Sequence, residues 1–253
     1  MTRVVKIGGR AQSDPTLPGA LAAAWHRMGS IVVVHGGGDE VSALQRAFGR
    51  ESRFVNGRRV TAPEDLELLR MALSGSANQR LVATLVGAGV RAVGLSGEDA
   101  AMMQAVAEAR ETMGEVGTPV SVDPTLLHLV LGAGFCPVVS PLARDRDSLS
   151  NGVLNVNGDD AAAAIAVALD ASELILVSDV DGVLVNGQPA DHLDADAVRS
   201  LISGGVASGG MAAKLDAALG ALGRGVVRVR IGSVRCLTHD MSGTVITLAG
   251  ASV

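Results

Sequence analysis

Residues 3–9 read RVVKIGG and residues 31–38 read IVVVHGGG. In both stretches, a short run rich in Val and Ile, with little alternation of polar and apolar positions, ends in glycines. Such runs are typical of parallel strands that are buried on both faces. The glycines allow a close turn at the carboxyl end of the strand, where open α/β sheets bind their ligands. The two stretches therefore predict a sheet with a binding site at the ends of these strands.

The rest of the chain repeats this alternation of short apolar runs with longer Ala-rich or amphipathic segments. Further strands are expected at 92–95, 137–140, 174–178, 227–231 and 244–248. Helices are expected at 17–27, 40–48, 63–74, 78–86, 124–133, 160–169, 194–203 and 211–222. Strands that alternate with helices predict an α/β fold with a mainly parallel sheet between layers of helices. The polar segment 144–152 is expected to form a loop or a hairpin.

The composition restricts the class of protein. The 253 residues are 48% hydrophobic and 2% aromatic, and their formal net charge is −5. This apolar fraction argues against disorder, and the acidic balance argues against binding to nucleic acid. No apolar run reaches the roughly 18 residues of a membrane span. Cys136 and Cys236 are expected to be buried thiols in a reduced cytoplasm, because the chain shows no signal-peptide pattern.

Lysine is rare in this chain, and the two lysines are therefore informative. Of the 21 cationic side chains only Lys6 and Lys214 are lysines. Codon bias in a GC-rich genome would explain the use of arginine elsewhere. Arginine cannot replace lysine where a compact, flexible point charge must meet a phosphate. We therefore expect both lysines to have a chemical role.

Both glycine motifs are suited to bind an anion. Gly8 and Gly9 follow Lys6 at a strand end, and glycines 36–38 follow His35 before a predicted helix. Backbone N–H groups at such places bind negative charge. The sequence contains no P-loop, no GxGxxG fingerprint and no GxSxG turn of an esterase. A close crossing of strand and helix is the alternative explanation, and His35 is expected to be a packed, hydrogen-bonded residue rather than a base.

Four further motifs carry polar side chains suited to substrates. In 56–61 (NGRRVT), one of two arginines is able to bind a carboxylate through two hydrogen bonds. In 155–159 (NVNGD), two amides and a carboxylate lead into a helix, where capping is the alternative role. The carboxylates of 178–184 (SDVDGVL) contact a nucleotide or metal, or shape a turn. Segment 209–214 (GGMAAK) brings the second lysine to the first turns of a helix.

The motifs VVKIGG, HGGG, NGRRVT, NVNGD, SDVDGVL and GGMAAK, in this order, resemble those of the amino-acid kinase family, and within it the acetylglutamate kinases. The resemblance covers essentially the whole chain. NGRRVT with ALSGSANQRLV (72–82), GEVG (114–117) and NVNGD are its more specific parts. It implies a three-layer αβα sandwich with an N-terminal lobe (1–171) for the acyl amino acid and dimerisation, and a C-terminal lobe (172–253) for ATP. The implied reaction is ATP-dependent phosphorylation of the γ-carboxylate of N-acetyl-L-glutamate in arginine biosynthesis.

The resemblance also implies a role for each matching residue. Lys6 and Lys214 would neutralise the transferring phosphoryl group, and Asp159 would hold both lysines in place. Arg59, assisted by Asn155, would bind the substrate α-carboxylate. The glycines that would line the substrate are Gly36 and Gly37, and those that would donate N–H groups to the phosphoryl group are Gly8, Gly9, Gly37 and Gly38. The residues expected to contact ATP are Ser178, Asp179, Val180, Asp181, Gly182, Val183, Leu184, Val206, Ala207, Ser208, Gly210 and Met211.

This chemistry suits the residues. A γ-carboxylate has a pKa of about 4.3 and is ionised at neutral pH, so the nucleophile needs no general base. Phosphoryl transfer needs in-line positioning and stabilisation of charge, which lysines, glycine N–H groups and Mg²⁺ supply. No metal site of the protein itself is expected, because Mg²⁺ would be carried by ATP phosphates and water.

Two alternatives remain open. A kinase of lysine biosynthesis that acts on carrier-linked aminoadipate would need basic surface near the acceptor, and Arg10, Arg50, Arg53 and Arg58 keep this possible. The other alternative is a non-catalytic nucleotide- or anion-binding protein, because fold does not fix function. Such a protein would not need both lysines and Asp159.

Two positions depart from the family pattern. Arg10 stands where a small residue is expected, and Gly209 stands where a polar one is expected.

Family members that arginine inhibits carry an extra helix before the first strand, whereas Lys6 is the sixth residue here. We therefore expect a homodimer without arginine feedback.

Overall fold

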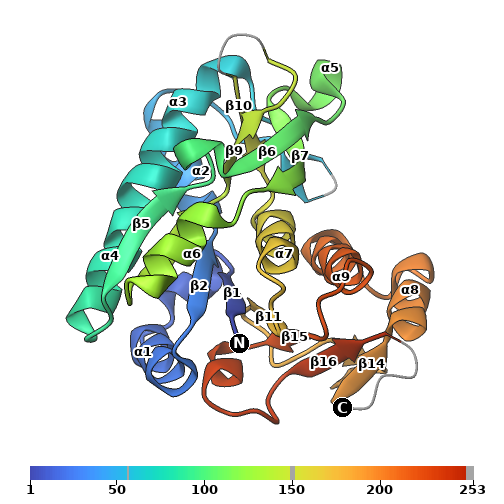
Figure 1. Ribbon diagram of the computed structural model, residues 1–253. Coiled ribbons are helices and arrows are strands. Elements are labelled where there is room, and N and C mark those ends of the chain that lie inside the picture. The colour runs from blue at the N-terminus through green and yellow to red at the C-terminus, as the bar shows by residue number, and fades with distance from the viewer. Residues whose placement is uncertain (56, 149–151, 249–253) are drawn as a thin grey trace.

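The computed structural model of the chain describes residues 1–55, 57–148 and 152–248. Its central sheet consists of β1 (Arg3–Ile7), β2 (Ile31–His35), β5 (Ala92–Ser96), β8 (Cys136–Ser140), β11 (Glu173–Val177), β14 (His192–Asp194), β15 (Val229–Gly232) and β16 (Thr244–Thr247). The strand order is β14-β16-β15-β11-β1-β2-β8-β5 (Figure 1). All seven strands predicted from apolar runs are present. Only β15 and β16 pair antiparallel, so a mainly parallel sheet is confirmed.

Helices cover both faces of this sheet (Figure 1). The α-helices of the described residues are α1 (Leu17–Met28), α2 (Gly38–Ala47), α3 (Leu66–Leu69), α4 (Asn78–Gly87), α5 (Arg110–Met113), α6 (Thr125–Gly132), α7 (Gly158–Ala168), α8 (Ala195–Ser203) and α9 (Gly209–Leu222), of which α3 and α5 do not lie on the sheet (Figure 1). Successive residues of a strand point to opposite faces. Accordingly, Val4 of β1 packs in one buried cluster with residues of α6, α7 and α9, whereas Val5 and Ile7 pack in another with residues of α1 and α4. The predicted three-layer arrangement is thus confirmed.

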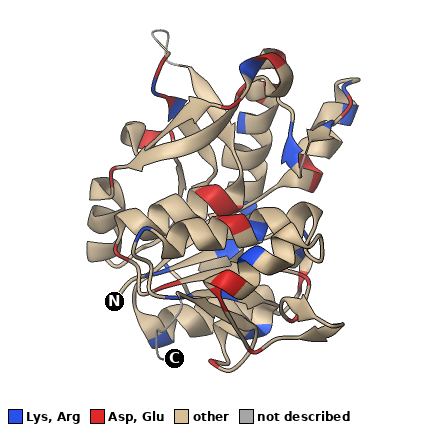
Figure 2. Ribbon diagram, turned by 90° about the vertical axis from the view of Figure 1, so that its right-hand side faces the viewer, with Lys and Arg blue, Asp and Glu red and all other residues tan. Residues whose placement is uncertain are grey.

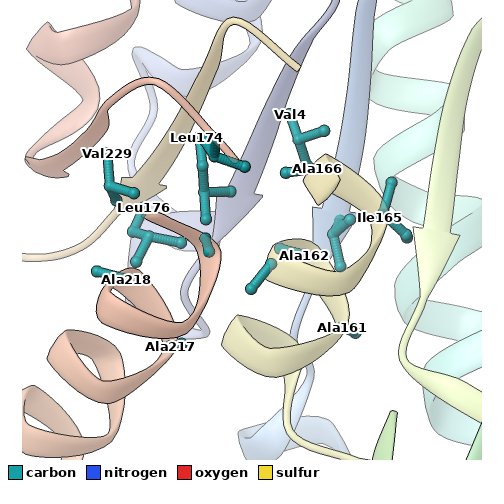
Figure 3. Close-up of a cluster of buried hydrophobic side chains, with 14 of the residues drawn as sticks. Val4, Ala161, Ala162, Ile165, Ala166, Leu174, Leu176, Ala217, Ala218 and Val229 are labelled. Atoms are coloured by element: carbon teal, nitrogen blue, oxygen red, sulfur yellow. The ribbon is translucent and has the colours of Figure 1, made fainter. Parts of the chain in front are cut away.

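Small side chains bring α7 and α9 close to the sheet. Residues 161–164 are four consecutive buried alanines of α7. Ala217 and Ala218 of α9 pack in the same cluster as Leu174 and Leu176 of β11 (Figure 3). Methyl groups let a helix backbone approach a sheet more closely than longer side chains do. This packing places α7 against β1 and β11, and α9 against β11.

A smaller, closed barrel was not predicted from the sequence. Its strands are β6 (Met103–Ala107), β7 (Val116–Val122), β9 (Leu142–Asp145) and β10 (Val153–Val156). They read MQAVA, VGTPVSV, LARD and VLNV, without the unbroken Val and Ile runs of the central sheet. β9 and β10 form an antiparallel pair, which confirms a hairpin in 144–152. Residues 149–151 of that segment lie outside the described residues.

One long helix replaces the two separate helices predicted at 63–74 and 78–86. After a short turn, η2 (Pro63–Asp65), the chain is helical through α3, the π-helical segment η3 (Arg70–Ala77) and α4. The break predicted at 75–77 is therefore wrong. The wider π turn accommodates these small residues, and the Ser76 hydroxyl donates to Ala72 O at 3.3 Å inside the helix.

The remaining elements are short connections. They are η1 (Arg10–Ser13), β3 (Phe54–Val55), β4 (Arg58–Arg59), η4 (Asp99–Ala101), β12 (Leu184–Val185), β13 (Gln188–Pro189) and η5 (Val234–Leu237). β3 and β4 pair as an antiparallel hairpin, and so do β12 and β13. The first of these hairpins matters most, because it carries the NGRRVT motif.

The distribution of surface charge and the burial of the two cysteines agree with what the composition predicts. Basic and acidic residues are interspersed in the view of Figure 2. Cys136 and Cys236 are free and buried, as predicted, and burial raises the pKa of the Cys136 thiol to about 12. Across residues 1–55, 57–148 and 152–248, no helix has both the length and the apolar character needed to cross a membrane.

Candidate active site

Two lysines from distant parts of the sequence meet at one carboxylate. Lys6 lies near the carboxyl end of β1, Asp159 in the first turn of α7, and Lys214 on α9. Lys6 Nζ is 2.9 Å from Asp159 Oδ1, and Lys214 Nζ is 3.2 Å from Oδ1 and 3.3 Å from Oδ2 of the same residue. All three side chains are buried. The predicted convergence of the two ammonium groups is therefore confirmed, while their roles stay predictions.

The buried triad of Lys6, Lys214 and Asp159 carries a surplus positive charge. Burial alone would raise the pKa of Asp159, but the two ammonium groups outweigh it and hold this pKa below its ordinary value. Burial, together with the Lys6 ammonium, lowers the pKa of Lys214. Because one carboxylate serves two cations, an anion bound beside the triad would be electrostatically favoured.

Two cavities meet at this triad. The first, of about 480 Å³, includes in its lining Gly36, Gly37, Gly38, Arg59 and Asn155, all of which the sequence predicts as site residues. The second, of about 610 Å³, includes Asp159, Lys214, Gly8, Ser178, Asp179, Val180, Gly210 and Met211. The residues that line both are Lys6, Gly9, Arg10, Gly57 and Asn157. A group that moves from one cavity to the other therefore passes the Lys6 ammonium.

The N-terminus of α2 faces the first cavity. Gly38 and Asp39, the first two residues of α2, line it. The first N–H groups of a helix have no partner within the helix, and they form the positive end of its dipole. A Cβ at Gly37, which precedes the helix, would lie 2.7 Å from Leu73 Cδ2, so a larger residue there would require the Leu73 side chain to shift. The HGGG motif thus supplies both space and donors for an anion.

The two glycines after Lys6 differ in their surroundings. The Gly8 N–H donates to Val177 O at 3.0 Å, because the pairing of β1 with β11 continues for one more residue. The predicted donation from Gly8 to a phosphoryl group is therefore not supported. Gly9 faces open space, since a Cβ built there meets no atom within 4 Å, and it lines both cavities.

Arg59 is buried and already donates from both terminal nitrogens. Nη1 donates to Gln45 Oε1 and Ser52 Oγ, each at 2.7 Å, and Nη2 donates to Gly38 O at 2.7 Å and Ser42 Oγ at 2.9 Å. Neutral oxygens thus take the positions predicted for a substrate carboxylate. Burial lowers the pKa of Arg59, and no carboxylate of the described residues forms an ion pair with it. The first cavity therefore has a positive wall.

The two amides of NVNGD have different partners. Asn155 Nδ2 donates to Thr61 Oγ1 at 2.9 Å. Asn157 caps α7, since its Oδ1 accepts the Asp159 N–H at 2.8 Å, so the alternative of helix capping is confirmed for this residue. Asn157 also lines both cavities, which we did not predict. Its place two residues before Asp159 is the signal that would have identified it.

Part of the predicted ATP segment lies away from the second cavity. The Val183 N–H donates to Thr244 Oγ1 at 2.8 Å, and a Cβ at Gly182 would lie 2.7 Å from the same oxygen. The turn after Asp181 thus folds against β16. Seven of the predicted ATP residues are absent from the described linings of both cavities, namely Asp181, Gly182, Val183, Leu184, Val206, Ala207 and Ser208.

The β3–β4 hairpin spans the boundary between the cavities. Its tip residue Gly57, at φ +77°, lies so close to α9 that a Cβ would be 3.6 Å from Gly209 C. Arg58 forms ion pairs with Asp160 at 2.8 Å and with Glu108 at 3.2 Å. Asn56, the first residue of NGRRVT, lies outside the described residues. The hairpin therefore connects the first cavity to the first turn of α9.

His35 has the packed role that the sequence predicts. It is fully buried, its Nδ1 lies 2.7 Å from Gly36 O, and its Nε2 lies 3.0 Å from Asn78 Nδ2. Donation by Nδ1 and acceptance by Nε2 satisfy both ring nitrogens in the neutral form. Burial lowers the pKa of His35, which favours that form.

The described residues contain no group of three or more His, Cys, Asp or Glu side chains arranged to hold a metal ion. The only carboxylate of the triad is bound to two ammonium groups, which compete with any cation. This donor set does not fit a resident metal.

Comparison with known proteins places this geometry in a family. The model of the amino acid kinase family matches residues 1–233. Acetylglutamate kinase of Chloroflexus aurantiacus is 43% identical over 241 residues, 94% of this chain and 93% of that protein. The structure of a Streptococcus mutans protein is 30% identical with a TM-score of 0.86, over 97% of this chain and 98% of that one. N-acetylglutamate synthase of Neisseria gonorrhoeae, solved with coenzyme A and N-acetyl-glutamate, is 26% identical with a TM-score of 0.81, over 99% of this chain and 60% of that one.

Replacing Asp159 by Asn is expected to destabilise the fold at neutral pH by about 3–5 kcal/mol, because two buried ammonium groups lose their counter-charge. The folded-state pKa of Asp159 lies below its unfolded value. The stabilisation is therefore complete above the unfolded pKa and is lost as the pH falls through the folded pKa. Urea unfolding of the wild type and Asp159→Asn should show a difference that shrinks as the pH falls below the unfolded pKa of about 3.9. A difference independent of pH would contradict ion pairing as its source.

Proposed function

Because the chain belongs to the amino acid kinase family, we propose that it transfers the γ-phosphoryl group of ATP to the γ-carboxylate of N-acetyl-L-glutamate, a reaction of arginine biosynthesis. Relatives named acetylglutamate kinase that match nearly the whole chain support this substrate. The observation that carries the proposal is the pair of buried ammonium groups between two cavities.

The first cavity takes the acyl amino acid and the second takes the nucleotide. All described lining residues of the first cavity belong to 1–171, the predicted N-terminal lobe. The second cavity adds Ser178, Asp179 and Lys214 from 172–253, the predicted C-terminal lobe. This distribution supports the division of the chain into an acceptor lobe and an ATP lobe.

The reaction requires no proton transfer. The ionised γ-carboxylate attacks the γ-phosphorus, a bond forms between its oxygen and phosphorus, and the bond from phosphorus to the β-γ bridging oxygen breaks. ADP leaves with that electron pair, and the product is an acyl phosphate. Charge on the phosphoryl oxygens is the main obstacle, so Lys6 and Lys214, held by Asp159 before the substrates arrive, lower the barrier.

The α-carboxylate of the substrate binds at Arg59. This guanidinium is buried and donates to neutral acceptors, so an incoming carboxylate adds a direct counter-charge to the more distant ones of Asp65 and Asp39. Asn155 lies in the same lining and supplies an amide to that carboxylate.

Magnesium enters as part of the nucleotide substrate. Mg²⁺ keeps several waters and favours phosphate oxygens over an all-protein cage. The triad offers it no free carboxylate, because Asp159 contacts both lysines. The Mg²⁺–ATP complex is therefore the second substrate in this proposal.

We further propose that the protein works as a cytoplasmic homodimer. β5 pairs only with β8 among the described strands and so ends the central sheet with a free edge. The nearby α6 reads TLLHLVLG, and its Leu129 is 66% exposed. A free strand edge beside an apolar surface is suited to a second copy.

A coupled assay of ADP release tests the function directly. N-acetyl-L-glutamate is expected to give turnover well above that with glutamate, aspartate, N-succinylglutamate or aminoadipate. Trapping of the product with hydroxylamine, which forms a hydroxamate from an acyl phosphate, identifies the bond made. ADP release without hydroxamate, or a preference for another acceptor, would contradict the proposed reaction.

Lys6→Arg is expected to lower kcat at least 100-fold or so, because the planar guanidinium cannot place a point charge at the same spot. Circular dichroism and the thermal midpoint should stay close to those of the wild type. Arg46→Lys, at an exposed position of α2 outside both cavities, is the matched control and should leave kcat unchanged. Turnover of Lys6→Arg within a few-fold of the wild type would remove Lys6 from the phosphoryl site.

Arg59→Ala is expected to raise KM for N-acetyl-L-glutamate by about tenfold or more, with KM for ATP nearly unchanged, because the α-carboxylate loses a charge-assisted contact. Since alanine also leaves Gln45 and Gly38 without their donor, Arg59→Lys serves as a second variant that keeps the charge. It should recover part of the loss in steady-state kinetics. An unchanged KM for the acyl amino acid in both variants would place its α-carboxylate elsewhere.

A further inference from the structure

Arg10 stands at the boundary of the two cavities, above the triad. It follows Gly9 at the end of β1 and opens η1, and it lines both cavities. Arg10 Nη1 donates to Asp179 Oδ2 at 3.0 Å. Asp179 follows β11, which is the neighbour of β1 in the sheet, so the loops after these two strands meet at the second cavity, which Lys6 also lines. Arg10 is therefore a third cation at the place where the cavities join.

The Arg10–Asp179 ion pair is easily exchanged. The two side chains are 82% and 43% exposed, and exposed ion pairs contribute little to stability. Only Nη1 of the guanidinium has a partner among the described residues, so most of its N–H donors are available to a ligand. Lys6 and Lys214, by contrast, are buried and bound to Asp159. Arg10 is thus the movable cation of the site.

We propose that Arg10 exchanges Asp179 for the γ-phosphate when ATP binds, and so acts as a third positive group on the phosphoryl group that is transferred. The proposal rests on the proposed function for the identity of the nucleotide. A triphosphate carries more negative charge than the single surplus cation of the triad balances. The γ-phosphate is the part of ATP that must lie where the cavities meet, and Arg10 is the exposed cation that lines both of them. A guanidinium binds phosphate oxygens through two parallel hydrogen bonds.

Because Arg10 is proposed to contact only the γ-phosphate, measurements of nucleotide binding are sufficient to test the proposal. Isothermal titration of the full chain with Mg²⁺ and either AMP-PNP or ADP reports affinity without turnover. Arg10→Ala is expected to weaken AMP-PNP binding about tenfold, as for loss of a charge-assisted hydrogen bond, and to change ADP binding by less than about twofold. Arg46→Ala removes the same charge from an exposed position outside both cavities and should leave both affinities unchanged.

A second substitution tests the exchange itself. Asp179→Asn removes the competing carboxylate, so AMP-PNP should bind about twofold to threefold more tightly when Arg10 is present. In the Arg10→Ala background the same substitution should have no such effect. Equal effects of Asp179→Asn in both backgrounds would overturn the exchange.

Other outcomes separate this proposal from the proposed function. Equal losses of AMP-PNP and ADP binding in Arg10→Ala, or losses below twofold for both, overturn the contact with the γ-phosphate even if the wild type phosphorylates N-acetyl-L-glutamate. If Arg10→Ala raises only the KM for the acyl amino acid, Arg10 contacts the acceptor, and this result also overturns the contact with the γ-phosphate. If the wild type phosphorylates another acceptor while Arg10→Ala loses AMP-PNP binding selectively, the acceptor proposed above is wrong and the role of Arg10 stands. A wild type that does not bind AMP-PNP overturns both.

Discussion

One shared carboxylate determines the geometry of the whole site. Asp159 accepts the ammonium groups of Lys6 and Lys214, which belong to the first strand and to a late helix, so it fixes β1, α7 and α9 relative to each other. Two like charges buried side by side without it would repel strongly in a medium of low dielectric. The close approach of these elements depends in turn on the alanine faces of α7 and α9 (Figure 3). The packing of these small side chains therefore also sets the positions of the charged groups.

Both cavities contain positive charge that the protein balances only in part. In the triad one carboxylate serves two cations, and the Arg59 guanidinium donates to neutral oxygens and lies over the Phe54 ring, with only the more distant Asp65 and Asp39 opposing its charge. Burying charge in this way costs stability. The cost is repaid when an anion binds, because the cations are already oriented. The site is thus complementary to two negatively charged ligands before either one arrives.

The sequence predicted the central sheet well, because strands buried on both faces leave continuous runs of Val and Ile. The barrel strands went unpredicted, since segments such as VGTPVSV contain turn-forming residues and lack an unbroken apolar run. The scarcity of lysine identified Lys6 and Lys214, and the fold confirmed that they meet. Sequence could not show that the Gly8 N–H pairs with Val177, that Arg59 is surrounded by acceptors, or that the turn after Asp181 folds on Thr244. Each of these depends on contacts between segments far apart in the chain.

The backbone at Gly209 explains one departure from the family pattern, and the neighbouring hairpin bears on the fate of the proposed product. Gly209 has φ +55°, a left-handed conformation that favours glycine, and a Cβ at the hairpin residue Gly57 would lie 3.6 Å from Gly209 C. Acyl phosphates are mixed anhydrides that water cleaves readily. The hairpin residue Gly57 lines both cavities and so forms part of the wall around the junction where the proposed reaction would form this anhydride. Premature hydrolysis would waste one ATP per event, so walls that restrict water at this junction would preserve the yield of the reaction.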